Sequence, residues 1–177
     1  PSLRGRPVIV GGRERGVVAS ASYEARAVGV HSAMPTARAL RLCPEAVLIP
    51  GRHERYREIS RAVMALLGSV TPALEQLSID EAFLDISGAQ LRLGRPTAIA
   101  ELIRERIRDE VGVPSSVGIA GSKHVAKLAS GFAKPDGLLL VPVAATVPFL
   151  HSLPVGAMWG VGEKTRELDG TPRALII

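Results

Sequence analysis

The stretch "EQLSIDEAFLDIS", residues 75–87, decides the fold because it places adjacent carboxylates, Asp80 and Glu81, inside an apolar, β-branched pattern typical of a strand. Successive strand side chains point to opposite faces, so two neighbouring acids cannot both enter one interior. A buried, ionised acid without a partner would also be costly. Both acids therefore fit a strand end or hairpin where a cation gathers them, and hard cations such as Mg²⁺ bind carboxylate and phosphate oxygens.

A second interpretation of the acid pair needs no cation. The same two carboxylates would suit an edge strand that faces solvent or forms salt bridges. Asp85 returns shortly afterwards and is a candidate neighbour of the pair. The dipeptide alone does not choose between the two interpretations.

The composition indicates a globular domain with a hydrophobic core, since 46% of the 177 residues are hydrophobic. No apolar run is long enough for a membrane span, and no signal peptide opens the chain. The single cysteine, Cys43, allows no internal disulfide and favours a reducing, cytoplasmic setting. The four histidines are scattered, which argues against a zinc site.

The charge balance weakly favours a polyanionic partner, because 22 Lys and Arg residues face 17 Asp and Glu residues and leave a net charge of +5. Aromatic residues make up only 3% of the chain, which is too few for a base-stacking platform.

Apolar periodicity and turn residues predict an α+β fold in which a sheet carries helices on one face. Strands are expected over residues 7–12, 16–22, 46–50, 115–121 and 137–142. Helices are expected over residues 23–29, 34–44, 53–68, 96–112 and 122–134, the last with Ser122 as its N-cap. After about residue 143 tight glycine turns replace the strand pattern, and we expect a domain boundary there.

Two further segments carry candidate phosphate-binding groups. In "SASYEAR", Ser20, Tyr23 and Arg26 stand at a predicted strand-to-helix transition, where a phenol and a guanidinium could hold phosphate oxygens. In "ASGFAKPDG", Lys134 follows a helix and could reach a triphosphate. The simpler interpretations are a solvated Arg26 and a Lys134 that complements the helix dipole. Lys123 and Lys127, four apart, are expected to form a solvated basic stripe.

The segment "WGVGEKT", residues 159–165, is only superficially similar to a P-loop, because a single residue separates its glycines instead of four. Nucleotide hydrolysis by that route is therefore rejected. A Gly-x-Gly turn at Gly160 and Gly162 could still expose backbone N–H groups to a phosphate, with Lys164 and Thr165 as added donors. A plain glycine turn is the alternative.

Taken together, five ordered segments resemble the Y-family DNA polymerases, most closely their DNA polymerase IV (DinB) type. These segments are "SYEAR", "GVHSAMP", "LSIDEAFLDIS", "SVGIAGSKHVAKLASGFAKPDG" and "LPVGAMWGVG". The resemblance implies a ferredoxin-like palm sheet over residues 1–12 and 51–142. It also implies small α/β fingers over residues 13–50 and a partial thumb with a helix-hairpin-helix turn over residues 143–177.

The resemblance also implies residue roles. Asp80 and Glu81 would bind two catalytic Mg²⁺ ions, with Mn²⁺ as the alternative. Ser20, Tyr23, Arg26 and Lys134 would hold the incoming dNTP, and Met34 and Pro35 would lie near the templating base. Gly160, Gly162, Lys164 and Thr165 would contact the DNA backbone.

The implied function is template-directed, low-fidelity DNA synthesis past lesions, on primer-template DNA and in the bacterial cytoplasm at the nucleoid. Two departures from the family pattern are expected: the first palm strand, with a metal-binding aspartate and a sugar-filter aromatic, and the little finger lie outside these 177 residues. A sliding clamp would bind through the missing C-terminal region, and this chain alone should be inactive. The alternatives are a non-catalytic scaffold at damaged DNA and, less well supported, a two-metal nuclease or phosphatase.

Overall fold

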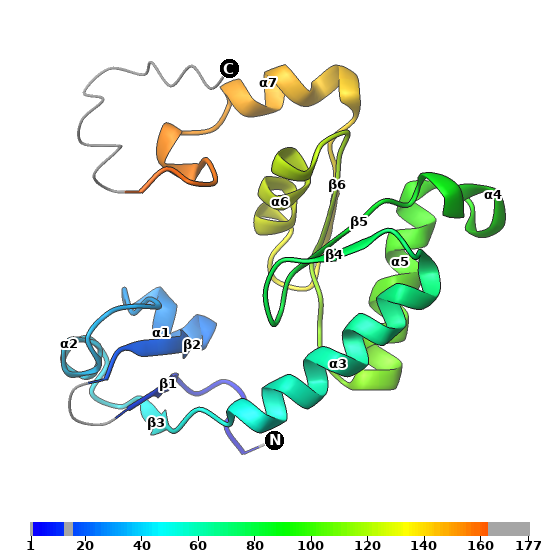
Figure 1. Ribbon diagram of the computed structural model, residues 1–177. Helices are drawn as coiled ribbons and strands as arrows, with labels where there is room; N and C mark the ends of the chain where they lie inside the picture. The colour runs from blue at the N-terminus through cyan, green and yellow to red at the C-terminus, as the bar shows by residue number, and fades with distance from the viewer. Residues whose placement is uncertain (1, 13–15, 163–177) are drawn as a thin grey trace. The chain divides into compact units, whose positions relative to one another are not determined.

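The computed structural model describes residues 2–12 and 16–162, and it has the expected α+β character (Figure 1). The chain divides into two compact units, Pro1–Tyr56 and Arg57–Ile177. Within the described residues, no helix is long and apolar enough to cross a membrane. The two units are described separately below.

The first unit is built on a three-stranded sheet in the order β2-β1-β3. The central strand β1 (Val8–Gly11) pairs antiparallel with β2 (Val18–Ala21) and parallel with β3 (Val47–Ile49). Two short helices, α1 (Tyr23–Ala27) and α2 (Thr36–Leu42), follow β2 along the chain. Small and β-branched side chains fill the core, which includes Ile9, Val18, Ala25, Val30, Met34, Ala39 and Cys43.

The pairing of β1 bears on the expected division into palm and fingers. That division groups residues 1–12 with residues 51–142, whereas the ladder joins β1 to strands on both sides of residues 23–42. Compactness likewise places residues 1–12 in the first unit. The names palm, fingers and thumb therefore stay a prediction about how the family's parts map onto this chain.

The second unit has a core made by two amphipathic helices and a hairpin. The helices are α3 (His53–Val70) and α5 (Pro96–Arg106), and the hairpin consists of β4 (Leu74–Gln76) and β5 (Ala82–Leu84). Apolar side chains at helical spacing meet in one cluster, which includes Leu66, Leu67, Val70, Ile99, Ile103 and Ile107. From α5 the chain continues through one π-helical turn, η2 (Ile107–Val111), and ends at Gly112 with a left-handed φ of 78°.

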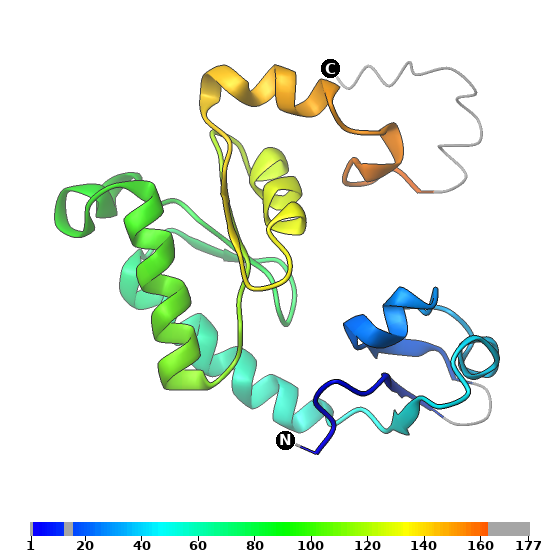
Figure 2. The same ribbon diagram turned by 180° about the vertical axis from the view of Figure 1, so that it is seen from behind.

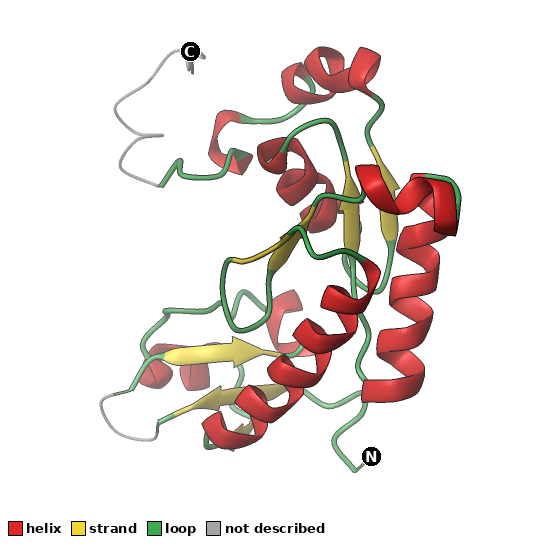
Figure 3. Cartoon of the chain, turned by 45° about the vertical axis from the view of Figure 1, so that its right-hand side comes forward, coloured by secondary structure: helices red, strands yellow, loops and turns green. Residues whose placement is uncertain are grey.

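A βαβ segment completes the second unit (Figure 2). Strand β6 (Val117–Ile119) pairs parallel with β7 (Leu138–Leu140), and α6 (Lys123–Phe132) connects them. Figure 3 shows the strands of both pairs in yellow. Among the described residues, β4-β5 and β6-β7 are hydrogen-bonded as two separate pairs, so the expected palm strands are present without one continuous ladder.

Helix α6 packs very closely on β6 because Gly118 has no side chain. A Cβ at Gly118 would lie 2.0 Å from the carbonyl oxygen of Ala126 and 2.3 Å from the amide nitrogen of Ser130. The helix begins at the predicted N-cap, since Ser122 Oγ accepts a hydrogen bond from Val125 N at 3.4 Å. Strand and helix therefore set the position of every side chain that α6 carries.

Several short helical segments were not expected. They are η1 (Ser87–Ala89), α4 (Gln90–Leu93), η3 (Val143–Ala145), α7 (Thr146–His151) and η4 (Val155–Ala157). Segments of three to six residues are too short to show a helical period in the sequence. Of the expected thumb, only residues 143–162 lie within the described part of the chain.

Candidate active site

The acid pair lies in the turn of the β4-β5 hairpin. The turn is closed by two backbone hydrogen bonds to Glu81 O, from Leu77 N at 2.9 Å and from Ser78 N at 3.1 Å. The strand expected over residues 75–87 is therefore a hairpin, in which three residues on each side pair. Asp80 and Glu81 are both exposed there, which agrees with the expectation of a strand end or hairpin.

A serine two residues earlier orients Asp80. Ser78 Oγ donates a hydrogen bond to Asp80 Oδ1 at 2.7 Å and accepts one from Asp80 N at 3.3 Å. This closed local pair limits the rotation of the Asp80 side chain. The carboxylate is thereby presented on the outside of the turn.

Glu81 is held differently, by a lysine from α6. Lys127 Nζ donates to Glu81 Oε1 at 2.7 Å, and the side chains are 20% and 45% exposed. One turn earlier on the same helix, Lys123 pairs with Glu75. The solvated basic stripe expected from Lys123 and Lys127 is therefore wrong for Lys127, which is only 20% exposed, whereas Lys123 is 59% exposed although it also pairs with an acid of the hairpin.

Strand alternation explains which hairpin residues meet α6. Leu74, Ala82 and Leu84 pack against the cluster formed by α3 and α5. Phe83 belongs to the opposite face of the strand, and Lys123 Nζ lies 5.8 Å from its ring centroid. By the same alternation Glu81 shares the face of Phe83, which is why it meets Lys127.

The remaining nearby acid, Asp85, has a structural role. Its carboxylate accepts a hydrogen bond from Ser87 N at 2.8 Å, and its backbone carbonyl accepts one from Thr71 Oγ1 at 2.8 Å. Hydrogen bonding to Ser87 lowers the pKa of the Asp85 carboxyl below its usual value. Asp85 thus fixes the exit of β5 instead of joining the acid pair.

The donor set of the acid pair suits a hard divalent cation, because both side chains are carboxylates and both reach solvent. Across residues 2–12 and 16–162, no group of three or more His, Cys, Asp or Glu side chains is placed to hold a metal ion. Asp80 and Glu81 are therefore the two side chains that would supply oxygen ligands from this hairpin.

In the first unit, the predicted triphosphate contacts lie at one strand-to-helix transition. Ser20 is on β2 opposite Val10, and Tyr23 opens α1 with its side chain 58% exposed. The Arg26 side chain is exposed and donates from Nε to Ala21 O at 3.0 Å. This bond steadies the guanidinium through Nε and uses neither of its two terminal nitrogens.

Sequence reasoning missed the residue that organises this transition, Ser22. Its Oγ accepts hydrogen bonds from Val8 N at 3.0 Å and Ala25 N at 3.4 Å, so it caps α1 and ties it to β1. The signal was a serine directly before the helix, which is a common N-cap. Ser22 also lowers the pKa of Glu24, although the backbone of Glu24 contributes more.

The two residues expected near the templating base differ in exposure. Met34 is 3% exposed and belongs to the core of the first unit. Pro35 is exposed, caps α2 and bridges to Val17. The surface at this place is therefore formed by Pro35, while the side chain of Met34 supports it from below.

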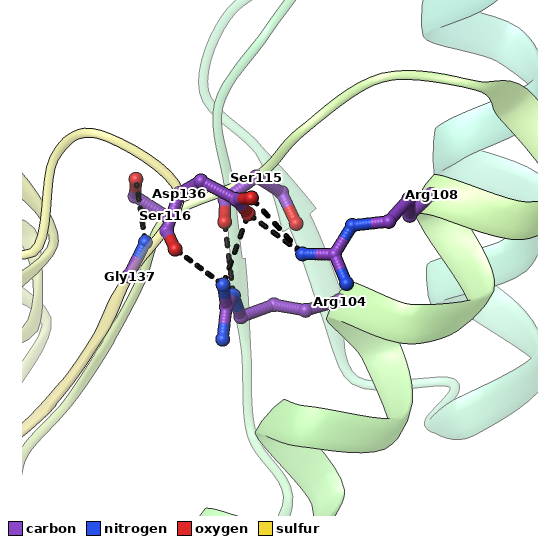
Figure 4. A network of polar contacts seen from close by, with 6 residues as sticks. All are labelled: Arg104, Arg108, Ser115, Ser116, Asp136 and Gly137. Carbon is purple, nitrogen blue, oxygen red and sulfur yellow. Dashed lines mark hydrogen bonds and ion pairs between the residues drawn. The ribbon is translucent and has the colours of Figure 1, made fainter.

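Lys134 lies in the loop after α6, near Asp136, whose contacts with two arginines are shown in Figure 4. Asp136, two residues after Lys134, has a left-handed φ of 46°. Arg104 donates to Asp136 Oδ1 at 2.9 Å and to its backbone carbonyl, and Arg108 contacts both carboxylate oxygens at 3.0 Å. The Arg104 hydrogen bond, with help from Arg108, lowers the pKa of Asp136.

The same arginine connects this loop to the strand entrance. Arg104 Nε also donates to Ser115 O at 3.0 Å, just before β6. Helix α5, the β6 entrance and the loop after α6 thus share one side chain. Lys134 itself is exposed on this fixed loop.

The segment after α7 brings an indole next to the lysines. The Trp159 ring lies 6.3 Å from Phe83 and 6.1 Å from His124 between centroids, and Lys127 Nζ is 5.1 Å from its centroid. The next residue, Gly160, has φ 89°, and Gly162 is exposed. Lys164 and Thr165, predicted as further donors, lie outside the described residues.

Most of the chain is similar to proteins of one family. The model of the impB/mucB/samB family matches residues 1–131. A protein called DNA polymerase IV from Treponema denticola is 49% identical over 94% of this chain and 42% of its own length. One of the same name from Alkalilimnicola ehrlichii is 51% identical over 94% of this chain and 48% of its own length. The chain thus spans less than half of these curated relatives.

Solved structures agree with the sequence relatives. DinB from Sulfolobus solfataricus is 31% identical with a TM-score of 0.85, over 96% of this chain and half (50%) of that one. The insertion ternary complex of Dbh DNA polymerase is 32% identical with a TM-score of 0.84, over 96% of this chain and 51% of that one. The predicted resemblance to Y-family polymerases is confirmed. With its family model matched over residues 1–131, this chain belongs to the impB/mucB/samB family.

Proposed function

We propose that this chain carries the catalytic part of a DNA-directed DNA polymerase, which adds deoxynucleotides to a primer 3′-hydroxyl with low fidelity and extends past lesions. The observation that carries the proposal is the exposed Asp80–Glu81 pair at a hairpin turn in a chain of this family. Such a pair supplies the hard oxygen ligands that nucleotidyl transfer requires. Residues 51–142, with residues 1–12, would serve as palm, residues 13–50 as fingers and residues 143–177 as part of a thumb.

The acid pair would hold the metal ions, Mg²⁺ by preference from the oxygen ligands and Mn²⁺ as the alternative. When bound, two such ions neutralise charge on the attacking and leaving oxygens of an in-line displacement. Asp80, oriented by Ser78, would present its carboxylate to the ions. Glu81 would do so on the side of the turn that faces α6.

The proposed nucleotide contacts are the four residues that the family resemblance implies. Arg26, steadied by Ala21 O, would offer its terminal nitrogens to phosphate oxygens in a two-pronged contact. Tyr23 and Ser20 would add hydroxyl donors beside it. Lys134 would act as a point charge on the triphosphate, and the clamped Asp136 loop would keep it in place.

The remaining partners follow from the same function. Primer-template DNA would contact Pro35 near the templating base, with the buried Met34 packed behind it. Gly160 and Gly162 would meet the DNA backbone, with Lys164 and Thr165 as neighbours. The excess of basic residues, 22 against 17 acids, suits a phosphate backbone. The protein would act at the nucleoid. A sliding clamp would bind it through residues other than these 177.

The test replaces one metal-binding acid in the complete gene product that contains these residues. Asp80→Ala and Glu81→Ala should each lower single-nucleotide addition by about a thousandfold or more, because charge on the reacting oxygens would lack its counter-ions. DNA binding should change little, since neither acid contacts phosphate directly. Primer extension and fluorescence anisotropy with labelled primer-template measure the two effects.

A matched control is Asp85→Asn, which alters a nearby acid that the structure uses only to fix the end of β5. It should keep most of the activity. Normal extension by either acid-pair variant would reject the polymerase mechanism and favour the scaffold alternative. Hydrolysis of DNA without deoxynucleotides would favour a nuclease.

A further inference from the structure

The side chain that contacts the acid pair from outside the hairpin is Lys127. Its ammonium lies 2.7 Å from Glu81 Oε1 and 5.1 Å from the centroid of Trp159. Only 20% of the lysine side chain is exposed, whereas the Glu81 side chain is 45% exposed. A cation from the protein itself therefore occupies the carboxylate that is proposed to bind a metal ion.

The position of this lysine is set by packing, not by the ion pair alone. Gly118 allows α6 to lie directly on β6, and Ser122 caps the first turn of the helix. Lys127 follows one turn after the cap and extends between the hairpin and the Trp159 ring. The ammonium already lies over the Trp159 ring while it contacts Glu81, and the ring can hold it there without the carboxylate because an indole face attracts cations.

We propose that Lys127 is a positioning residue whose ammonium, held over the Trp159 ring, occupies Glu81 until a divalent cation binds, and then gives up Glu81 while keeping its contact with the ring. The inference rests on the proposed role of Asp80 and Glu81. Lys127 keeps Glu81 turned toward α6 and compensates its charge in the metal-free protein. A divalent ion takes the carboxylate by displacing a monovalent one, and the lysine stays close through the indole.

Lys123 provides a matched comparison within the same helix. It also pairs with a hairpin acid, Glu75, and also lies near an aromatic ring, Phe83. Its side chain is 59% exposed, and its partner is not one of the two proposed ligands. Lys123→Met and Lys127→Met therefore remove the same charge from the same helix, but only the second removes a competitor for the metal site.

The experiment measures Mn²⁺ binding to the complete gene product that contains these residues, from the electron paramagnetic resonance signal of the free ion, with Mg²⁺ as competitor at constant ionic strength. Lys127→Met should bind Mn²⁺ about three- to tenfold more tightly than the unchanged chain, as expected for removing a half-buried competing charge. Lys123→Met should stay within about twofold, because its charge is more exposed and screened. Lys127→Arg, which keeps the charge, should restore weak binding.

A second readout follows the lysine itself. Trp159 is the single tryptophan of these 177 residues, so in a gene product that keeps no other tryptophan its emission reports on the ring over which the ammonium lies. Addition of Mg²⁺ should change this emission in the unchanged chain and in Lys123→Met. The change should be largely lost in Lys127→Met, although the ion still binds.

The outcomes separate the inference from the function on which it rests. Equal Mn²⁺ affinities for the two methionine variants, or weaker binding by Lys127→Met, would overturn the role of Lys127 while leaving the metal site intact. Absence of any Mn²⁺ binding that Glu81→Gln removes would instead reject the acid pair as the metal site. In that case the proposed function fails first, and the inference fails with it.

Discussion

The hairpin turn at residues 77–81 and the loop at residues 133–137 both carry candidate functional side chains, yet they are held in contrasting ways. In the turn, the Glu81 side chain has one lysine partner among the described residues, and Asp80 is held by a serine of the same turn. In the loop, one carboxylate, that of Asp136, receives two arginines. Lys134 thus stands on a clamped backbone, whereas the acids stand on a turn whose partners can be exchanged.

The contrast between the hairpin turn and the loop fits the function proposed for each. A metal ligand must change partners when an ion arrives, and a flexible lysine with one contact can yield its place. An anchor for a triphosphate gains from being preorganised, since less ordering is needed when the ligand binds. Arginine forks hold planar carboxylates with two directed bonds, which a lysine cannot do.

The largest expected effect comes from displacing α6, the helix that contacts the hairpin turn and leads into the loop at residues 133–137. Gly118→Ala would put a methyl group 2.0 Å from the Ala126 carbonyl oxygen and should push α6 away from β6. We expect a loss of roughly 3 kcal/mol in the free energy of unfolding, as for overpacking without space to relax. Urea denaturation followed by circular dichroism measures it.

The control for that experiment is Gly131→Ala, at a position on the same helix where an added Cβ meets nothing within 4 Å. It should leave stability unchanged or slightly raised, because alanine favours a helix over glycine. Equal free energies of unfolding for the two alanine variants would show that the close contact between α6 and β6 does not stabilise this part of the fold.

An intermediate effect is expected from loosening only the clamped loop. Arg104→Met removes bonds to both Asp136 and Ser115, so the complete gene product should show a KM for dNTP raised by roughly tenfold, with a smaller change in kcat. Steady-state single-nucleotide incorporation measures both constants. Arg108→Met is the matched variant and should have the weaker effect, since Arg108 is 49% exposed and contacts Asp136 alone among the described residues.

If Arg108→Met raised the KM as much as Arg104→Met, the two arginines would act only through their charge. If neither variant changed the KM, the clamp would have no part in presenting Lys134. Either result would remove the contrast between the loop and the hairpin turn.

The smallest effect concerns acid stability. The arginine contacts lower the pKa of Asp136 in the folded chain, so their contribution is fully present above the unfolded value of about 4 and is lost as the pH falls through the lower folded value. Asp136→Asn should therefore lower the melting temperature slightly at neutral pH and flatten its fall below about pH 4. Thermal melts across that range test the sign, and a variant that melts in parallel with the unchanged chain would contradict it.

Much of the fold could be predicted because the signals were local. Apolar spacing predicted α3 and α5, and Ser122 predicted the start of α6, all close to their observed bounds. The two adjacent acids of Asp80–Glu81 predicted an exposed strand end or hairpin, since a continuous strand cannot bury both. The partners across elements could not be predicted, because charge and spacing leave many pairings open.

The sequence by itself determined the longer helices, most of the strands and which side chains could bind metal and phosphate, since periodicity and residue chemistry are properties of short stretches. Only the tertiary structure decided that Lys127 faces Glu81, that Arg104 and Arg108 share Asp136, and that Met34 is buried. The physical reason is the packing of α6 on β6, and of the hairpin on α3 and α5. These contacts join residues that are distant in the chain, so no local pattern records them.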